Sequence, residues 1–137
     1  MVIVGLNFKK IELERKDIVK GNIKINNNVS IKSVEEKDLA LGKAKQSGLN
    51  FIFEFVSKYE PDVGEIKLIG DVLFLDEPKR IKELSAQWKK DKKIDKDVMA
   101  DVLNNVLNKC NIQALILSQD INLPPPIPLP KVQTKEN

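Results

Sequence analysis

The sequence contains no histidine and a single cysteine, and these two shortages exclude several kinds of reactive site. Without histidine the chain has no usual general base near neutral pH, no Ser-His or Cys-His nucleophile pair, and no imidazole ligand for a transition metal. Cys110 cannot form an internal disulfide or a site with several thiolates, and it lies in an apolar helical pattern that favours a buried, inert thiol. We therefore expect a protein that is not an enzyme, with no catalytic residues, no metal and no cofactor.

The sequence also lacks long apolar runs and a large charge surplus. No stretch approaches the roughly 18 apolar residues of a membrane span, and Met1–Gly5 has no charged leader before its apolar residues. The 23 Lys and Arg and the 20 Asp and Glu are mostly interleaved. The densest basic stretch, Lys89–Lys93, is interrupted by Asp91 and is typical of a solvated loop, with a phosphate contact as the alternative. These features predict a soluble cytoplasmic protein with no membrane span and no specific nucleic-acid partner.

The first half of the chain shows the period-two pattern of β-strands. Apolar residues alternate from Val4 to Leu13 and change phase across Lys9-Lys10, which predicts a bent or bulged strand. Residues 23–34 alternate around Asn26-Asn27-Asn28 and indicate either a hairpin or one interrupted strand. The polar residues 35–48 are interpreted as an exposed connection with a short helical turn at 38–45.

The strongest strand signal is Leu49–Val56, which places Phe51, Phe53 and Phe55 on one face. A loop at 61–64 leads into a second long strand over 65–75, where Gly70 indicates a bulge or a close approach of another segment. Two such strands joined by a short loop predict an antiparallel sheet. The phenylalanine face is either a core under a helix or part of an apolar groove.

The second half of the chain changes to helical periodicity. Acidic residues followed by Pro78 mark the start of a short helix, and Ile94-Asp95 begins a long one. The long helix has one row of small and apolar residues at spacings of three and four: Val98, Val102, Val106, Cys110, Ala114 and Leu117. Strands followed by helices predict an α+β fold, in which a short and a long helix pack on one side of an antiparallel sheet.

Residues 121–130, here called the strap, have the sequence INLPPPIPLP and carry no charge. Proline fixes φ and removes a backbone donor, so we expect polyproline II. Its three-residue repeat puts Leu123, Pro126, Leu129 and Val132 on one edge, and Pro124, Ile127 and Pro130 on another. Such a strap either packs on its own chain or serves as an exposed proline-rich ligand. We expect residues 1–132 to form a single domain and 133–137 a disordered polar tail.

The order of these elements resembles the SecB family of export chaperones. Three segments carry the resemblance: the strands 49–56 and 65–75, the helix 98–117, and the strap with its leucine-and-proline run. The chain departs from the family in being slightly basic, whereas members typically use an acidic sheet surface to engage the translocation motor. It also ends at Asn137, without a C-terminal helix after the strap.

The resemblance implies a protein that holds unfolded polypeptides in long apolar grooves. It also implies a homo-oligomer, a dimer or tetramer, whose sheets associate and whose long helices pack together. The candidate client-binding residues are Phe51, Phe53, Phe55, Leu123, Pro126, Ile127 and Leu129. The leading hypothesis is therefore a non-enzymatic chaperone for apolar segments of client polypeptides, linked to protein export. The alternatives are a dedicated assembly subunit or adaptor with one folded partner and, after it, a nucleic-acid-binding protein.

Overall fold

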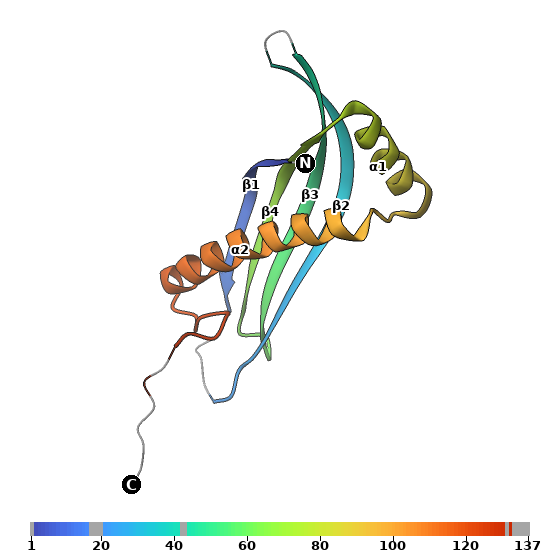
Figure 1. Cartoon of the computed structure of the whole chain (residues 1–137). Helices are drawn as coiled ribbons and strands as arrows, with labels where there is room; N and C mark the ends of the chain where they lie inside the picture. The colour runs from blue at the N-terminus through green and yellow to red at the C-terminus, as the bar shows by residue number, and fades with distance from the viewer. Residues whose placement is uncertain (1, 17–20, 42–43, 131, 133–137) are drawn as a thin grey trace.

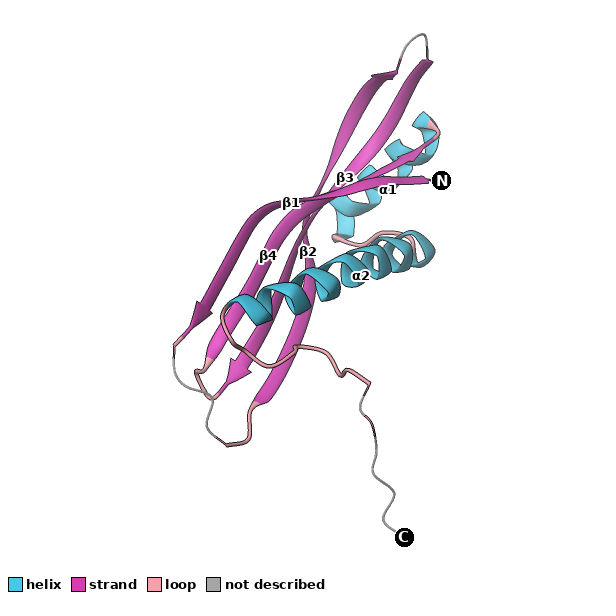
Figure 2. Cartoon of the chain, turned by 90° about the vertical axis from the view of Figure 1, so that its left-hand side faces the viewer, coloured by secondary structure: helices cyan, strands magenta, loops and turns pink. Residues whose placement is uncertain are grey.

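The computed structural model describes residues 2–16, 21–41, 44–130 and 132, which form a four-stranded antiparallel sheet followed by two helices (Figure 1). The elements are β1 (Val2–Arg15), β2 (Lys24–Leu41), β3 (Ala44–Glu60), β4 (Gly64–Asp76), α1 (Pro78–Asp91) and α2 (Lys96–Asp120). The strand order is β1-β4-β3-β2. Both helices lie on the same side of the sheet, and α2 crosses the strands (Figures 1 and 2). The predicted α+β fold is confirmed. The predicted polar tail at 133–137 lies outside the described residues.

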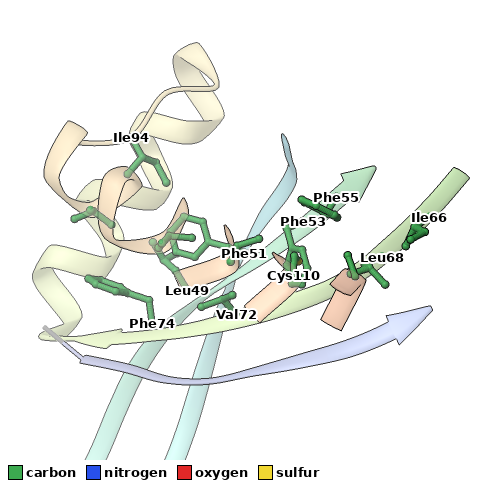
Figure 3. Close-up of a cluster of buried hydrophobic side chains, with 14 of the residues drawn as sticks. Leu49, Phe51, Phe53, Phe55, Ile66, Leu68, Val72, Phe74, Ile94 and Cys110 are labelled. Atoms are coloured by element: carbon green, nitrogen blue, oxygen red, sulfur yellow. The ribbon is translucent and has the colours of Figure 1, made fainter. Parts of the chain in front are cut away.

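The core lies between α2 and the covered face of the sheet (Figure 3). Phe51, Phe53 and Phe55 of β3 are all completely buried. They alternate with residues of the open face because successive strand side chains point to opposite sides. The helix contributes the predicted row, in which five members are buried: Val98, Val102, Val106, Cys110 and Ala114. The row ends in the buried Ser118 rather than in Leu117, which is half-buried.

The first strand is irregular at two places. A register shift between Phe8 and Lys10 confirms the predicted bulge at Lys9-Lys10. A second shift, between Ile3 and Gly5, was not predicted. It takes Val4 out of the alternation, so that 55% of the Val4 side chain is exposed while Ile3 packs against the core.

The structure decides between the two interpretations of residues 23–34 and overturns the one given for residues 35–48. Asn26–Asn28 lie inside β2, paired with Val56–Lys58, so the single strand is confirmed and the hairpin at the asparagines is excluded. Residues 35–41 and 44–48 are strand rather than loop, and they continue the β2–β3 pairing from Glu35↔Asn50 to Leu41↔Ala44. Their polar composition concealed the strand because β4 accompanies β3 only as far as Ser47. The β2–β3 pairing beyond this point is a two-stranded extension of the sheet.

The helix boundaries follow the predicted start signals. Pro78 occupies the first turn of α1, where its missing N–H costs no hydrogen bond. Asp95 caps α2, and its carboxylate accepts a hydrogen bond from the Asp97 backbone N–H at 3.0 Å. The same carboxylate forms an ion pair with Arg80 of α1 at 2.9 Å. Asp95 and Asp97 are thus residues of a helix start.

Gly70 of β4 is required by the close approach of β1. A Cβ atom at this position would overlap the carbonyl oxygen of Asn7 and would lie 2.8 Å from Cζ of the Phe53 ring. Gly70 pairs with Phe8, beside the bulge in β1, and with Phe53 in β3. The close approach predicted at Gly70 is therefore confirmed, whereas the neighbouring bulge lies in β1 and not in β4.

We expect Gly70→Ala to lower the free energy of unfolding by roughly 2–4 kcal/mol, because the new methyl group meets backbone that cannot move without disturbing the ladder. Urea denaturation followed by Trp88 fluorescence measures this change. Gly5→Ala in β1 is the matched control, since a Cβ there meets nothing within 4 Å. We expect it to be neutral or slightly stabilising. Equal effects of the two substitutions would contradict the assigned role of Gly70.

Candidate functional site at the strap

The strap begins in a helix-ending motif that fixes its direction. Asn122 has a φ of 56°, in the left-handed region that asparagine tolerates. Its N–H donates to the Gln119 carbonyl at 3.4 Å, and the N–H of Leu123 donates to the Ser118 carbonyl at 2.9 Å. This pair of bonds is the Schellman arrangement, which satisfies the last carbonyls of α2 and reverses the chain. The apolar residue that follows such a motif, here Leu123, packs back into the core, where it is 5% exposed.

The strap then crosses the covered face of the sheet one strand at a time. Leu123 lies against Gly64 of β4, where a Cβ atom would approach its methyl groups at 3.2 and 3.3 Å. Pro124 is bound by β3, since its carbonyl accepts a hydrogen bond from the Tyr59 hydroxyl at 2.7 Å. Pro126 is bound by β2, since its carbonyl accepts one from the Asn27 side chain at 2.8 Å. The strap therefore covers the end of the sheet that α2 does not reach.

A polar network holds the strap at this position. The Ser57 hydroxyl donates to the side-chain oxygen of Asn27, which orients the Asn27 amide so that its nitrogen donates to the strap. Tyr59 is 1% exposed, and burial raises the pKa of its hydroxyl to about 12. The Tyr59 hydroxyl consequently stays protonated, as donation requires, throughout the neutral and mildly alkaline range.

An open groove of about 600 Å³ lies between the strap and β2. Its lining carries no charged side chain and consists of Ile25, Asn27, Pro124, Pro125, Pro126, Ile127, Pro128 and Leu129. A second hollow, of about 540 Å³ on β1 and β4, is lined mainly by charged residues, among them Glu12, Glu14, Glu65 and Lys67. Of these two, only the strap groove offers an apolar surface.

The structure separates the seven predicted client-binding residues into two groups. Phe51, Phe53 and Phe55 are fully buried beneath α2, so they belong to the core, and a ligand would reach them only if α2 moved (Figure 3). The other four belong to the strap. Leu123 and Pro126 are buried on the edge that faces the sheet, Ile127 is half-buried, and Leu129 is 43% exposed at the mouth of the groove.

Sequence reasoning missed one wall of the groove and one exposed apolar pair outside it. Ile25 and Asn27 form the β2 wall of the groove, but asparagines in succession suggested a turn. Ile112 and Ile116 are exposed on the outer side of α2, at 58% and 52%. Their spacing of four on a helix could have revealed them, since they lie outside the buried row.

Reactive side chains do not gather at the strap. Cys110 is completely buried, and burial raises the pKa of its thiol to about 12, so the nucleophilic thiolate is suppressed at neutral pH. Within the described residues, no group of three or more His, Cys, Asp or Glu side chains is placed to hold a metal ion. The groove at the strap is thus lined by uncharged and mostly apolar side chains.

Comparison with protein-family models, with curated proteins and with solved structures finds no match. The resemblance to the SecB family consequently rests on the order of the elements and on the strap. In the part of the chain that the structure describes, neither helix combines the length and hydropathy needed to cross a membrane.

We expect Tyr59→Phe to lower the free energy of unfolding by about 1 kcal/mol at pH 8, because the Pro124 carbonyl loses its donor while the ring remains. This difference should shrink between pH 10 and 12. The pKa of Tyr59 rises from 10.0 to about 12 on folding. In this range the unfolded wild type therefore releases a proton that the folded state retains, and wild-type stability falls. Urea titrations at pH 8, 10 and 11.5 test the prediction, and a difference that is constant with pH would contradict it.

Proposed function

We propose that this protein is a SecB-like, non-enzymatic chaperone that binds apolar segments of unfolded or partly folded polypeptides, with a link to protein export. The observation that carries the proposal is the uncharged groove between the strap and β2. An apolar client segment that enters the groove displaces water, and no charged side chain of the protein is buried against the segment. Because no lining side chain is charged, the groove would select by hydrophobicity rather than by a particular sequence.

The position of the groove beside an edge strand supports binding of extended segments. β2 lies at one end of the strand order, so its outer edge has no strand partner among the described residues. Such an edge can pair with an added extended segment through main-chain hydrogen bonds, while adjacent pockets receive alternate side chains. The five prolines of the strap lack N–H donors, so the strap itself is poorly suited to pair as a fifth strand.

Leu129→Asp tests the groove directly. Leu129 is 43% exposed, so the folded protein should keep its melting temperature within a few degrees, while an added charge at the groove mouth should weaken client binding about tenfold or more. Val132→Asp is the matched control, because it adds the same charge at a position that is 97% exposed and outside the groove lining. The measurement is suppression of aggregation of reduced insulin and of a second, unrelated denatured protein, together with affinity for an unfolded, fluorescently labelled client.

The possible results separate the two functional hypotheses. The chaperone hypothesis is supported if the wild type and Val132→Asp suppress the aggregation of both clients and Leu129→Asp does not. If the wild type suppresses the aggregation of neither client, the chaperone hypothesis is overturned. A dedicated subunit with one folded partner is then favoured. Leu123→Asp reports on the strap as a structural element, because a charge on this buried residue should unfold the protein or make it insoluble.

We also propose that the protein forms a homo-oligomer, a dimer or tetramer. The helices leave the other face of the sheet uncovered (Figure 2), and that face carries partly exposed apolar residues on the two central strands: Ile52, Ile69, Leu73 and Leu75. Each of these four side chains is partly exposed on that face. Association of two copies through such surfaces would remove apolar area from water.

We expect light scattering coupled to size exclusion to give a mass of two or four chains at micromolar concentration. A monodisperse monomer under these conditions would contradict the oligomer and the SecB-like assembly. Leu73→Glu should reduce the mass if the open face is the contact, whereas Lys109→Glu, on the exposed side of α2, should leave it unchanged.

A further inference from the structure

The positive charge of this protein is concentrated in residues 78–96, which lie between the acidic residues Asp76-Glu77 and Asp97. Residues 78–96 contain eight Lys and Arg against three Asp and Glu, while the rest of the chain contains 15 against 17. The formal net charge of +3 therefore results from a segment of +5 and a remainder of −2. A charge separation of this kind produces a local positive potential that the small net charge does not reveal.

The lysines of this segment form no ion pair with any described residue, unlike several lysines on the sheet. In the described residues, Lys9, Lys10, Lys16 and Lys32 of the strand region form ion pairs with carboxylates. In the α1 segment only Arg80 does so, with Asp95. The remaining seven cations form no ion pair with a described residue and constitute what we call the basic surface: Lys79, Lys82, Lys89, Lys90, Lys92, Lys93 and Lys96.

The geometry of α1 turns these lysines away from the sheet. Ile81, Leu84 and Ser85 form its buried face. Lys79, Lys82, Lys89 and Lys90 recur at spacings of three, seven and eight, which places them along the opposite face. Lys92 ends the helix in the left-handed conformation, and Lys93 and Lys96 continue the exposed surface toward α2. The 14 residues of α1 extend this surface over roughly 21 Å at 1.5 Å per residue.

We propose that the basic surface binds the anionic headgroups of a lipid membrane, as a peripheral contact. Each lysine near an anionic membrane contributes an attraction that adds to the others, and four to eight clustered lysines are typical of such contacts. The surface consists of lysines alone, whose compact ammonium groups suit a diffuse layer of charge. The forked recognition of individual phosphates is instead a property of arginine, and Arg80 is already paired with Asp95.

The same residues are less suited to RNA. Recognition of single-stranded RNA uses exposed aromatic rings on which bases stack. The aromatic residue of this segment, Trp88, is half-buried, and the Lys92 ammonium lies 5.6 Å from its ring centroid. A membrane contact needs no such stacking platform. The observations therefore favour a lipid surface over a nucleic acid.

Attachment through α1 would leave the strap groove accessible. α1 lies near one end of the sheet and the strap near the other, as both views of the chain show (Figures 1 and 2). A protein lying on a membrane through its basic surface would thus hold the groove away from the headgroups. The lipid contact rests on the charge distribution and stands independently of what the groove binds.

Vesicle flotation with the full chain tests the proposal. The probes are vesicles of phosphatidylcholine alone and of phosphatidylcholine with 30% phosphatidylglycerol, at about 50 and 300 mM salt. The test variant is Lys89→Gln, Lys90→Gln, Lys93→Gln. The control, Lys24→Gln, Lys58→Gln, Lys109→Gln, removes the same charge from exposed lysines elsewhere that form no ion pair with a described residue. Melting temperatures of both variants verify folding.

We expect binding to the anionic vesicles only, weakened at high salt, reduced about a hundredfold in the test variant and less than fivefold in the control. Equal binding to both vesicle types, no binding to either, or equal losses in the two variants would overturn the proposal. Poly(U), offered at the same phosphate concentration, tests the alternative that the basic surface binds nucleic acid. If it binds through these lysines more tightly than the vesicles do, the basic surface is a nucleic-acid contact.

Discussion

The fold depends on the burial of the phenylalanine face of β3. Three rings on one strand form an apolar surface that water disfavours, and a single sheet cannot bury it by itself. α2 supplies the cover by crossing the strands with its row of small and apolar residues (Figure 3). Since the strands are longer than the width of one helix, α1 covers one end of the sheet and the strap covers the other. The three covering segments therefore have different chemistry but the same structural requirement.

The strap differs from the helices because it must cover the sheet without joining it. Its prolines withhold the backbone donors that a fifth strand would need. Two side chains of the sheet hold the strap instead. The Tyr59 hydroxyl and the Asn27 amide each donate a hydrogen bond to a backbone carbonyl oxygen of the strap. With this kind of attachment, the outer edge of β2 has no strand partner among the residues that the structure describes, and β2 forms one wall of the groove. A helix packed at the same position would have filled the groove with side chains.

The sequence predicts the elements that touch the core and fails where the core is absent. The alternation in β3, the start signals at Pro78 and Asp95, and the phase change at Lys9-Lys10 all reflect a buried side, and each was located correctly. The β2–β3 pairing continues beyond Ser47 without β4, and the polar residues of this extension resembled a loop. Pattern reasoning detects burial, and it detects strand pairing only when pairing and burial coincide.

The strap shows a second limit of prediction from sequence. Its three-residue repeat correctly placed Leu123 and Pro126 on one edge, and both are buried. The repeat also placed Leu129 on that edge, but the chain bends at Pro126-Ile127, and Leu129 is exposed. Where the strap leaves the sheet depends on the position of Asn27, which lies 99 residues earlier in the chain than Pro126. Local periodicity contains no information on such a distant contact.

Gly70 also bears on how the chain selects one alignment of its strands. If β1 slid along β4 by two residues, every side chain would remain on its correct face, so hydrophobic patterning alone cannot distinguish the two pairings. The missing Cβ at Gly70 creates a notch on β4 that accepts the backbone of β1 at Asn7, next to the bulge at Lys9. In the shifted pairings the notch would face regular strand, and the side chain of Leu68 or Val72 would meet the bulge. A residue without a side chain thus serves as the reference point from which the register of the edge strand is counted.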